Sequence, residues 1–424
     1  MHDLRALREQ AVELRAALRR RGQEQALAPI IDRAVQLDGD RRSTIQAVEE
    51  RKAARNTLSQ EVARKKKAGQ SADEEQAGSR ALGEEIATLE SELAAAQGEL
   101  DSLLLQLPNA VLADVPAGGE ESNTVVRSWG EPRAASGVAP HWEVGEKLGL
   151  IDLPRGAKIA GSGFIVFRGA GAGLVRGLLN LMLDLHTREH GYEETWVPVL
   201  ANRAAMTGTS QLPKFEEDMY ALSTDELFLI PTAEVPLTNL YREEILPEAE
   251  LPKSFAAYSP CFRREAGSHG KDTRGLLRVH EFDKVELVRY ALPDRSAAEL
   301  ELLTGHAERV LQLLELPYRV VLLAAGDTGF ASAKTYDLEV FAPGVGKWLE
   351  VSSCSNFTDF QARRADIRYR PADGGKPRFV HTLNGSGLAL PRIIAALLEH
   401  GQQPDGSVLL PEALRSYTRT DRLT

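Results

Sequence analysis

The chain has 424 residues, more than one compact core normally organises, so we expect about two domains. Hydrophobic residues make up 43% and charged residues 26%, and the 35 glycines and 21 prolines are ordinary numbers, which excludes collagen-like and wholly disordered chains. Because the formal net charge is −10, any contact with nucleic acid must use a local basic patch rather than the bulk charge.

Cysteine content and hydropathy both bear on the compartment in which the protein resides. The two cysteines, Cys261 and Cys354, are too few for a disulfide scaffold or a four-thiolate zinc site and fit a reducing environment. We expect both to be small buried residues. The N-terminal stretch alternates Arg and Glu with apolar residues, unlike a secretory signal. Since no apolar run approaches the roughly 20 residues that cross a bilayer, we predict a cytoplasmic protein without membrane contact.

From about Ile30 to Leu107 the chain is rich in strong helix formers. The second half of this segment repeats apolar residues at alternating steps of four and three, which is the seam of a left-handed coiled coil. These residues are Leu82, Ile86, Leu89, Leu93, Ala96, Leu100, Leu103 and Leu107. Between the halves, Gly69 is placed to end one helix and Asp73 to cap the next. The pattern predicts an antiparallel helical hairpin.

The two predicted helices differ in charge. Residues 33–67 carry ten Lys and Arg against five Asp and Glu, whereas residues 73–107 carry one against nine, so the helices should attract each other. The basic helix ends in Arg64-Lys65-Lys66-Lys67 at the tip. On this fact alone, a solvated end and a contact for a polyanion are equally good interpretations.

After Pro108 the composition changes, and helix-period and strand-period segments alternate as in an α+β domain. Short loops between several apolar segments are typical of antiparallel strand pairs. The expected strands are Phe164–Phe167, Leu227–Pro231, Phe255–Arg263, Val279–Tyr290, Val320–Leu323, Leu338–Phe341 and Trp348–Ser353. The expected helices are Gly173–His190, Ala297–Leu316 and Leu388–His400.

Three familiar motifs do not carry the function. His186 and His190 fit the spacing of an inverted zinc protease motif, but two solvated surface histidines explain the pattern equally well and we expect no zinc. The glycines of residues 169–173 lack the spacing of a dinucleotide loop, and Gly346-Lys347 is followed by Trp348 where a phosphate loop needs Ser or Thr. Any nucleotide site must therefore be built another way.

Three later segments combine residues suited to a nucleotide. Arg263 ends a strand beside a glycine-rich loop, and its planar guanidinium can clamp a phosphate at two points, although an ion pair with a nearby carboxylate is the simpler alternative. Glu350 lies on a later strand, where it could hold Mg²⁺. Finally, the glycines of Asn384-Gly385-Ser386-Gly387 precede a helix with Arg392 in its first turn. Close backbone approach and a second arginine fit an anion or purine site.

These segments, in this order, resemble the class II aminoacyl-tRNA synthetases, and most closely the bacterial-type seryl-tRNA synthetases. The three family motifs resemble residues 190–199, residues 262–286 and residues 385–392. The seryl subgroup is marked by Thr232-Ala233-Glu234, by Gly208-Thr209 followed by Gln211–Phe215, and by the N-terminal hairpin. Six matching segments in order are a specific signal, and they extend over essentially the whole chain.

The resemblance implies a helical tRNA-binding arm at residues 1–107, with the long hairpin at about 30–107, and a catalytic domain at residues 108–424. The catalytic domain should contain an antiparallel sheet flanked by helices, and the chain should form a homodimer. Its implied activity is the formation of seryl-adenylate from L-serine and ATP, followed by transfer of serine to the 3' end of tRNA(Ser), with tRNA(Sec) as a further expected substrate.

The resemblance also assigns residues. It implies catalytic roles for Arg263, Glu350 and Arg392, with Mg²⁺ held with ATP at Glu350. The implied serine-binding residues are Thr232, Ala233, Glu234, Glu286 and Ser386. The implied ATP-binding residues are Arg263, Arg264, Glu265, Glu350, Val351, Ser352, Ser353 and Arg392. The implied tRNA-binding residues are Arg51, Lys52, Arg55, Arg64, Lys65, Lys66 and Lys67.

Physical chemistry supports the serine assignments, because a zwitterion needs a carboxylate for its ammonium group and a buried hydroxyl needs polar partners. Two alternatives stay open from the sequence. One is an adenylate-forming relative that passes an amino acid to a carrier protein, and the other is a coiled-coil adaptor whose synthetase-like domain is inactive. The sequence also leaves open whether loops near Gly208 and Gly267 close on ATP.

Overall fold

The computed structural model describes residues 1–266 and 274–424, and the chain divides into two compact units. One unit holds residues 2–19 and 23–107. The other holds residues 108–424 together with Met1 and residues 20–22.

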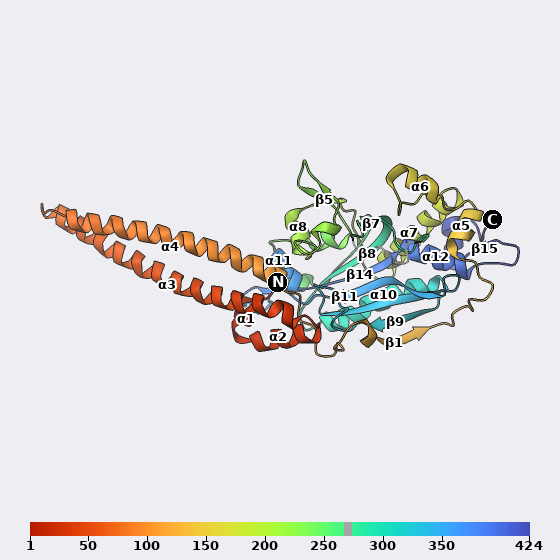
Figure 1. Cartoon of the computed structure of the whole chain (residues 1–424), viewed down its shortest axis with the longest axis horizontal. Helices are drawn as coiled ribbons and strands as arrows, with labels where there is room; N and C mark the ends of the chain where they lie inside the picture. The colour runs from red at the N-terminus through yellow and green to blue at the C-terminus, as the bar shows by residue number, and fades with distance from the viewer. Residues whose placement is uncertain (267–273) are drawn as a thin grey trace. The chain divides into compact units, whose positions relative to one another are not determined.

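The first unit is built around two long helices. Short helices α1 (Leu4–Glu9) and α2 (Ala11–Arg20) precede α3 (Glu24–Lys67) and α4 (Asp73–Gln106), which lie side by side as the predicted antiparallel hairpin (Figure 1). Buried apolar side chains of both helices form the seam, among them Leu37, Val48, Ile86 and Leu100. Long helices such as these are stabilised mainly by this packed apolar stripe.

Ion pairs join the basic helix to the acidic one, as the charge count predicted. These pairs are Arg33–Glu99, Arg51–Glu85, Lys52–Glu90 and Lys65–Glu75. Most of their side chains are exposed, so each pair contributes little to stability.

Two boundaries of the hairpin differ from the prediction. Helix α3 begins at Glu24 rather than near Ile30, with Pro29 inside it. Pro29 is the sixth residue of this helix, so its missing N–H costs the hydrogen bond to the carbonyl oxygen of Gln25. Asp73 is the first residue of α4 and not its cap. Instead, the hydroxyl of Ser71 accepts a hydrogen bond from the backbone N–H of Asp73 at 3.4 Å.

The second unit contains an eight-stranded sheet in the order β1-β9-β10-β11-β14-β8-β7-β2. All neighbours are antiparallel, as predicted, except the parallel pair β7–β2. In sheet order the strands are Thr124–Trp129, Tyr318–Leu322, Lys334–Ala342, Lys347–Asn356, His381–Ala389, Glu281–Ala291, Lys253–Phe262 and Glu193–Glu194. The strand expected at Phe164–Phe167 is wrong, because only an isolated bridge from Phe167 to Ile151 forms there.

Three helices contribute to the core on one face of this sheet: α7 (Ala170–Arg188), α10 (Ser296–Leu313) and α12 (Leu390–His400) (Figure 1). The strands alternate in polarity accordingly. Along β8, Val285 and Leu287 belong to this core, whereas Lys284 and Glu286 point to the opposite face. That opposite face, in the middle of the sheet, is therefore free to carry polar chemistry.

Smaller elements complete the second unit. Three small sheets combine β3 (Leu200–Asn202), β4 (Ala221–Leu222) and β5 (Leu227–Leu229); β6 (Ile245–Pro247), β12 (Arg368–Arg370) and β13 (Arg378–Phe379); and β15 (Val408–Leu409) with β16 (Arg422–Leu423). The remaining α-helices are α5 (His141–Lys147), α6 (Leu153–Ala160), α8 (Arg203–Gly208), α9 (Glu234–Thr238), α11 (Phe360–Ala365) and α13 (Glu412–Thr418). The 3-10 turns are η1 (Glu120–Ser122), η2 (Glu216–Asp218) and η3 (Glu248–Glu250).

Several sequence expectations are settled by burial. Cys261 and Cys354 are free and buried, as expected. His186 is also fully buried, and its ring contacts His190 and the carbonyl oxygen of Gly387, so the interpretation of two solvated histidines is wrong. Within the described residues, no helix is long and apolar enough to cross a membrane.

Candidate active site

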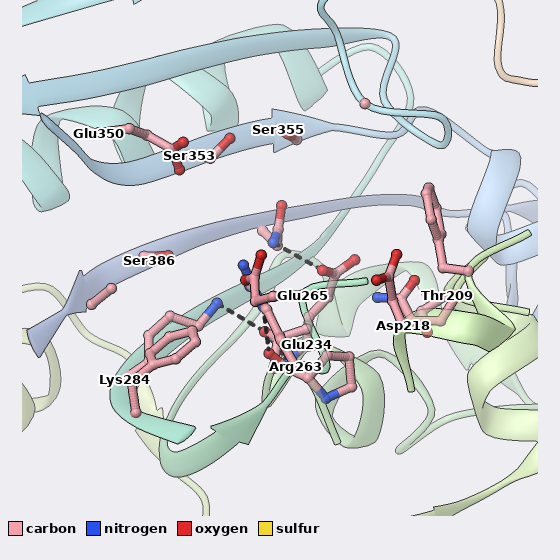
Figure 2. Close-up of a pocket in the computed structure, with 18 of the residues that line it drawn as sticks. Thr209, Asp218, Glu234, Arg263, Glu265, Lys284, Glu350, Ser353, Ser355 and Ser386 are labelled. Atoms are coloured by element: carbon pink, nitrogen blue, oxygen red, sulfur yellow. Dashed lines mark hydrogen bonds between the residues drawn. The ribbon is translucent and has the colours of Figure 1, made fainter. Parts of the chain in front are cut away.

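A cavity of about 580 Å³ opens on the polar face of the large sheet. Its walls come from β8, β11, β14, the ends of β7 and β5, and the start of α12 (Figure 2). The sequence-predicted residues that line it are Thr232, Glu234, Arg263, Glu265, Glu350, Val351, Ser353, Ser386 and Arg392. Segments more than 150 residues apart in the chain therefore meet in one cavity.

Four predicted residues do not line the cavity. Ala233 is fully buried in an apolar cluster, and Ser352 donates a hydrogen bond to the carbonyl oxygen of Ser386 at 2.8 Å. The exposed side chain of Arg264 reaches the carbonyl oxygen of Glu217 at 3.2 Å. The fourth, Glu286, lies beneath the cavity wall and is fully buried.

Glu286 is nevertheless bonded to the cavity wall. Thr232 Oγ1 donates a hydrogen bond to Glu286 Oε2 at 3.1 Å and accepts one from Lys284 Nζ at 2.9 Å. Lys284 also forms an ion pair with Glu286, and Asn384 Nδ2 donates to Glu286 Oε1 at 2.8 Å. Because its charge is already paired with Lys284, Glu286 acts on the cavity through Thr232 and Asn384.

Glu234 carries the other acidic charge at this end of the cavity (Figure 2). Burial, followed by the charge of Glu286, raises the pKa of Glu234 to about 7. No ion pair to Glu234 is found in the described part of the chain, so its charge lacks a cationic partner in contact. A buried carboxylate of this kind is a natural counterion for a cationic ligand.

A β-bulge shapes the opposite wall. The pairing of β10 with β11 shifts register between Leu338 and Glu339, so that Val351 is the extra residue. Regular alternation would put Glu350 and Ser353 on opposite faces, whereas with the bulge both line the cavity. A carboxylate and a hydroxyl are thereby combined on one strand.

Two of the arginines that line the cavity, Arg263 and Arg392, are held by backbone carbonyls. Arg263 Nε donates to the carbonyl oxygen of Pro231 at 3.4 Å, and its guanidinium lies 5.1 Å from the ring centre of Phe282. Arg392 Nη1 donates to the carbonyl oxygen of Glu350 at 2.6 Å and lies 3.6 Å from the carboxylate of the same residue. In the described residues Arg263 forms no ion pair, which removes the simpler alternative for it.

The glycines before Arg392 have a packing role that the sequence did not predict. Asn384–Gly387 lie inside β14, and a Cβ on Gly385 would stand 2.3 Å from Leu303 and 2.9 Å from Cys354. A Cβ on Gly387 would stand 2.6 Å from the ring of His186. These glycines therefore let α10 and α7 pack against the back of the sheet.

Many lining residues were not assigned from the sequence, and three of them bear directly on the chemistry. Lys284, Phe282 and Asn384 all line the cavity. Lys284 and Phe282 follow from strand periodicity, because they alternate with buried residues on the same face as Glu286. Asn384 has no such signal of its own. The loop near Gly267, whose closure the sequence left open, lies outside the described residues.

Comparison with known proteins gives the family. Residues 1–111 match the family model for the seryl-tRNA synthetase N-terminal domain, and residues 215–401 match the class II tRNA synthetase core domain of the G, H, P, S and T enzymes. A serine–tRNA ligase of Gemmatimonas aurantiaca is 66% identical over 98% of both chains, and one of Geobacillus kaustophilus is 53% identical over 98% of both.

The chain belongs to the seryl-tRNA synthetase family. Its fold agrees: the crystal structure of seryl-tRNA synthetase from Pyrococcus horikoshii complexed with ATP superposes with a TM-score of 0.94 at 36% identity, covering 100% of this chain and 99% of that one. The chain is thus an aminoacyl-tRNA synthetase, and its activity is the ligation of serine to tRNA. Transfer to a carrier protein is not supported, because the match includes the N-terminal domain of this family.

Proposed function

We propose that the cavity activates L-serine with ATP and that the resulting seryl-adenylate is passed to the 3' end of tRNA(Ser). The observation that carries this proposal is that Arg263, Arg392 and the β11 residue Glu350 line one cavity with Glu234. Glu234 is a buried carboxylate for which the described residues provide no ion pair. We place the reaction in the cytoplasm, because two free buried thiols fit a reducing compartment.

The serine end is assigned to Glu234, Thr232 and Ser386. Glu234 pairs with the substrate ammonium, since no cation among the described residues forms an ion pair with its buried charge. Thr232 and Ser386 supply polar partners for the serine hydroxyl, and Glu286 orients Thr232 from below. A substrate without the hydroxyl leaves the Ser386 hydroxyl without this partner and gives up the contact with Thr232, so alanine should be bound more weakly than serine.

The nucleotide end is assigned to Arg263, Glu265, Arg392 and Phe282. Arg263 holds the α-phosphate, and Arg392 faces the remaining phosphate charge or the purine from the start of α12. Phe282 contributes an aromatic surface on which a base can stack. With both substrates held, the serine carboxylate attacks the α-phosphorus, the bond to pyrophosphate breaks, and no side-chain nucleophile is needed.

The same site then serves the second step. The terminal 3'-hydroxyl of tRNA attacks the carbonyl carbon of seryl-adenylate, and AMP leaves with the electron pair of the broken anhydride bond. Arg263, still bound to the α-phosphate, stabilises the charge that develops on AMP. The chain's own residues thus act by positioning and by charge throughout.

Strand β11 carries oxygen ligands that could bind the Mg²⁺ of a nucleotide. Glu350 and Ser353, brought to one face by the bulge, are the residues that would hold it. No cluster of three or more metal-ligating side chains occurs among the described residues, which suits an ion that takes its other ligands from phosphates and water. When bound, it would neutralise phosphate charge. Glu350 meanwhile fixes Arg392 through its carbonyl oxygen.

We also propose a homodimer. The segment of residues 190–199, which resembles the dimer-interface motif of class II synthetases, contains Trp196 with 82% of its surface exposed. Trp196 lies two residues after β2, the two-residue strand at the edge of the large sheet. A large exposed aromatic next to an open sheet edge is typical of an interface.

Serine-dependent exchange of pyrophosphate into ATP tests the proposed function. Replacing Arg263 by Ala should lower the exchange rate by about 100-fold or more, because one guanidinium contact to the reacting phosphate is lost. Arg370→Ala is the matched control, since Arg370 is an exposed strand residue outside the cavity. We expect the wild type to exchange pyrophosphate with serine but not with alanine. If it shows no exchange with serine, the proposed function is refuted and the alternative of a coiled-coil adaptor with an inactive synthetase-like domain is favoured.

A further inference from the structure

A chain of buried hydrogen bonds ends on Glu234 from behind the cavity wall. Gln361 Nε2 donates to Glu234 Oε1 at 2.7 Å, and Asn384 Nδ2 donates to Glu234 Oε2 at 3.1 Å. Both donors are neutral amides. Each oxygen of this carboxylate therefore has a hydrogen bond, but the described residues provide no ion pair for its charge.

Gln361 itself does not reach the cavity. It lies on α11, is fully buried, and is absent from the cavity lining. Behind it, the equally buried Thr382 of β14 donates its hydroxyl to Gln361 Oε1 at 2.7 Å. Because Gln361 Oε1 accepts from Thr382, the other end of the amide, Nε2, is turned toward Glu234. This orientation matches an ionised Glu234, since an ionised carboxylate only accepts hydrogen bonds.

The contact with Gln361 opposes the effect of burial on Glu234. Burial and the charge of Glu286 raise the pKa of Glu234, whereas the hydrogen bond from Gln361 lowers it, with smaller help from Lys284 and Arg263. Those three, Glu286, Lys284 and Arg263, are the charged groups that act on Glu234 from β8 and from the end of β7. Without the amide the carboxylate would hold its proton to a higher pH.

We propose that Gln361 is a positioning residue for the substrate amino group: its N–H keeps Glu234 ionised and directed into the cavity, so that serine meets a charged counterion near neutral pH. This inference rests on the proposed function and deepens it. It assigns a role in substrate binding to a side chain that touches neither serine nor ATP.

The proposal predicts the direction of a pH effect. Protonated Glu234 cannot pair with an ammonium group, so the affinity of the wild type for serine should strengthen as the pH rises through about 7. In Gln361→Met, which keeps the volume but lacks the donor, the midpoint of this profile should move to higher pH. Serine affinity at pH 7 should fall about tenfold or more, as for loss of a hydrogen bond to a charged group.

The full-length chain is suitable for the test. The Michaelis constant for serine and that for ATP are measured by pyrophosphate exchange from pH 6 to 8.5, and serine binding without ATP is measured by calorimetry over the same range. Gln361→Met should raise the constant for serine, with little change in the constant for ATP or in kcat. Thr382→Val, which only frees the amide to turn, should shift the midpoint in the same direction by a smaller amount.

The control is Thr304→Val, because Thr304 is also a fully buried threonine but donates to the Leu300 carbonyl oxygen, away from Glu234. It should lower stability without moving the pH midpoint. The proposal is overturned if Gln361→Met keeps the wild-type profile, or if Thr304→Val moves it equally. If Gln361→Met fails to fold, Thr382→Val decides alone, and an unshifted midpoint in it overturns the proposal. Absence of serine-dependent exchange in the wild type would instead refute the proposed function.

Discussion

At the residue scale, Gly385 shows how packing on one face of the sheet controls chemistry on the other. Its neighbour Ser386 lines the cavity, while Gly385 leaves room for Leu303 of α10 behind the sheet. A methyl group at position 385 would overlap Leu303 at 2.3 Å. Either the buried Leu303 side chain or β14 would have to shift, and a shifted β14 would displace Ser386 and Asn384 together.

We therefore expect Gly385→Ala to lower the free energy of unfolding by about 1 to 3 kcal/mol, as overpacking in a core does. Gly305→Ala, on the same helix α10 and with no atom within 4 Å of the added methyl, should raise it by about 0.5 to 1 kcal/mol through helix propensity. Urea unfolding measures both. Equal stability of Gly385→Ala and the wild type would contradict this account of the packing.

At the scale of elements, the hairpin divides its basic residues into two classes. Arg51, Lys52 and Lys65 form ion pairs with Glu85, Glu90 and Glu75 of α4. No ion pair is found within the described residues for Arg55, Arg64, Lys66 or Lys67. All seven were predicted from the sequence to bind tRNA, and this remains a prediction. Because cations that are paired within the protein gain less from a phosphate, the unpaired four should contribute most.

Replacing Lys66 and Lys67 together by Ala should weaken tRNA binding and lower the dependence of log Kd on log salt by roughly one per lost phosphate contact. Lys52→Ala should have a smaller effect, since Lys52 is already bound to Glu90 at 3.0 Å. Serine-dependent pyrophosphate exchange should stay unchanged in both variants. If Lys52→Ala lowered tRNA affinity as much as the double replacement, the division into two classes would be wrong.

At the scale of the whole molecule, the proposed homodimer explains the exposure of Trp196. A side chain 82% exposed on a sheet edge costs solubility unless a partner covers it. Trp196→Glu places a charge at that position, so it should shift the chain from dimer to monomer in sedimentation velocity experiments. Val12→Glu, at a residue 77% exposed in the helical unit, is the control and should leave the mass unchanged. An undisturbed dimer in Trp196→Glu would exclude this edge as the interface.

Local patterns in the sequence were enough for much of this protein. The heptad seam predicted the hairpin, since helix period and charge act between residues that are near in sequence or repeat along a whole helix. Strand periodicity predicted the antiparallel sheet, and motif order predicted the family and nine of the residues that line the cavity. The errors lie at helix ends, at Phe164–Phe167 and at the buried His186, where capping contacts, single bridges and burial depend on atoms that a residue pattern does not specify.

Only the tertiary structure decided which hydrogen bonds and ion pairs connect the residues of the site. The pairing of Glu286 with Lys284 leaves Glu234 as the buried carboxylate without a cation, and this follows from the packing of β8 against α9 and β14. The bulge at Val351 reverses the side on which Glu350 lies. Gln361 reaches Glu234 across 127 residues of sequence. Such contacts depend on the relative placement of elements to within a few tenths of an ångström, which is set by how their buried faces fit and not by either segment alone.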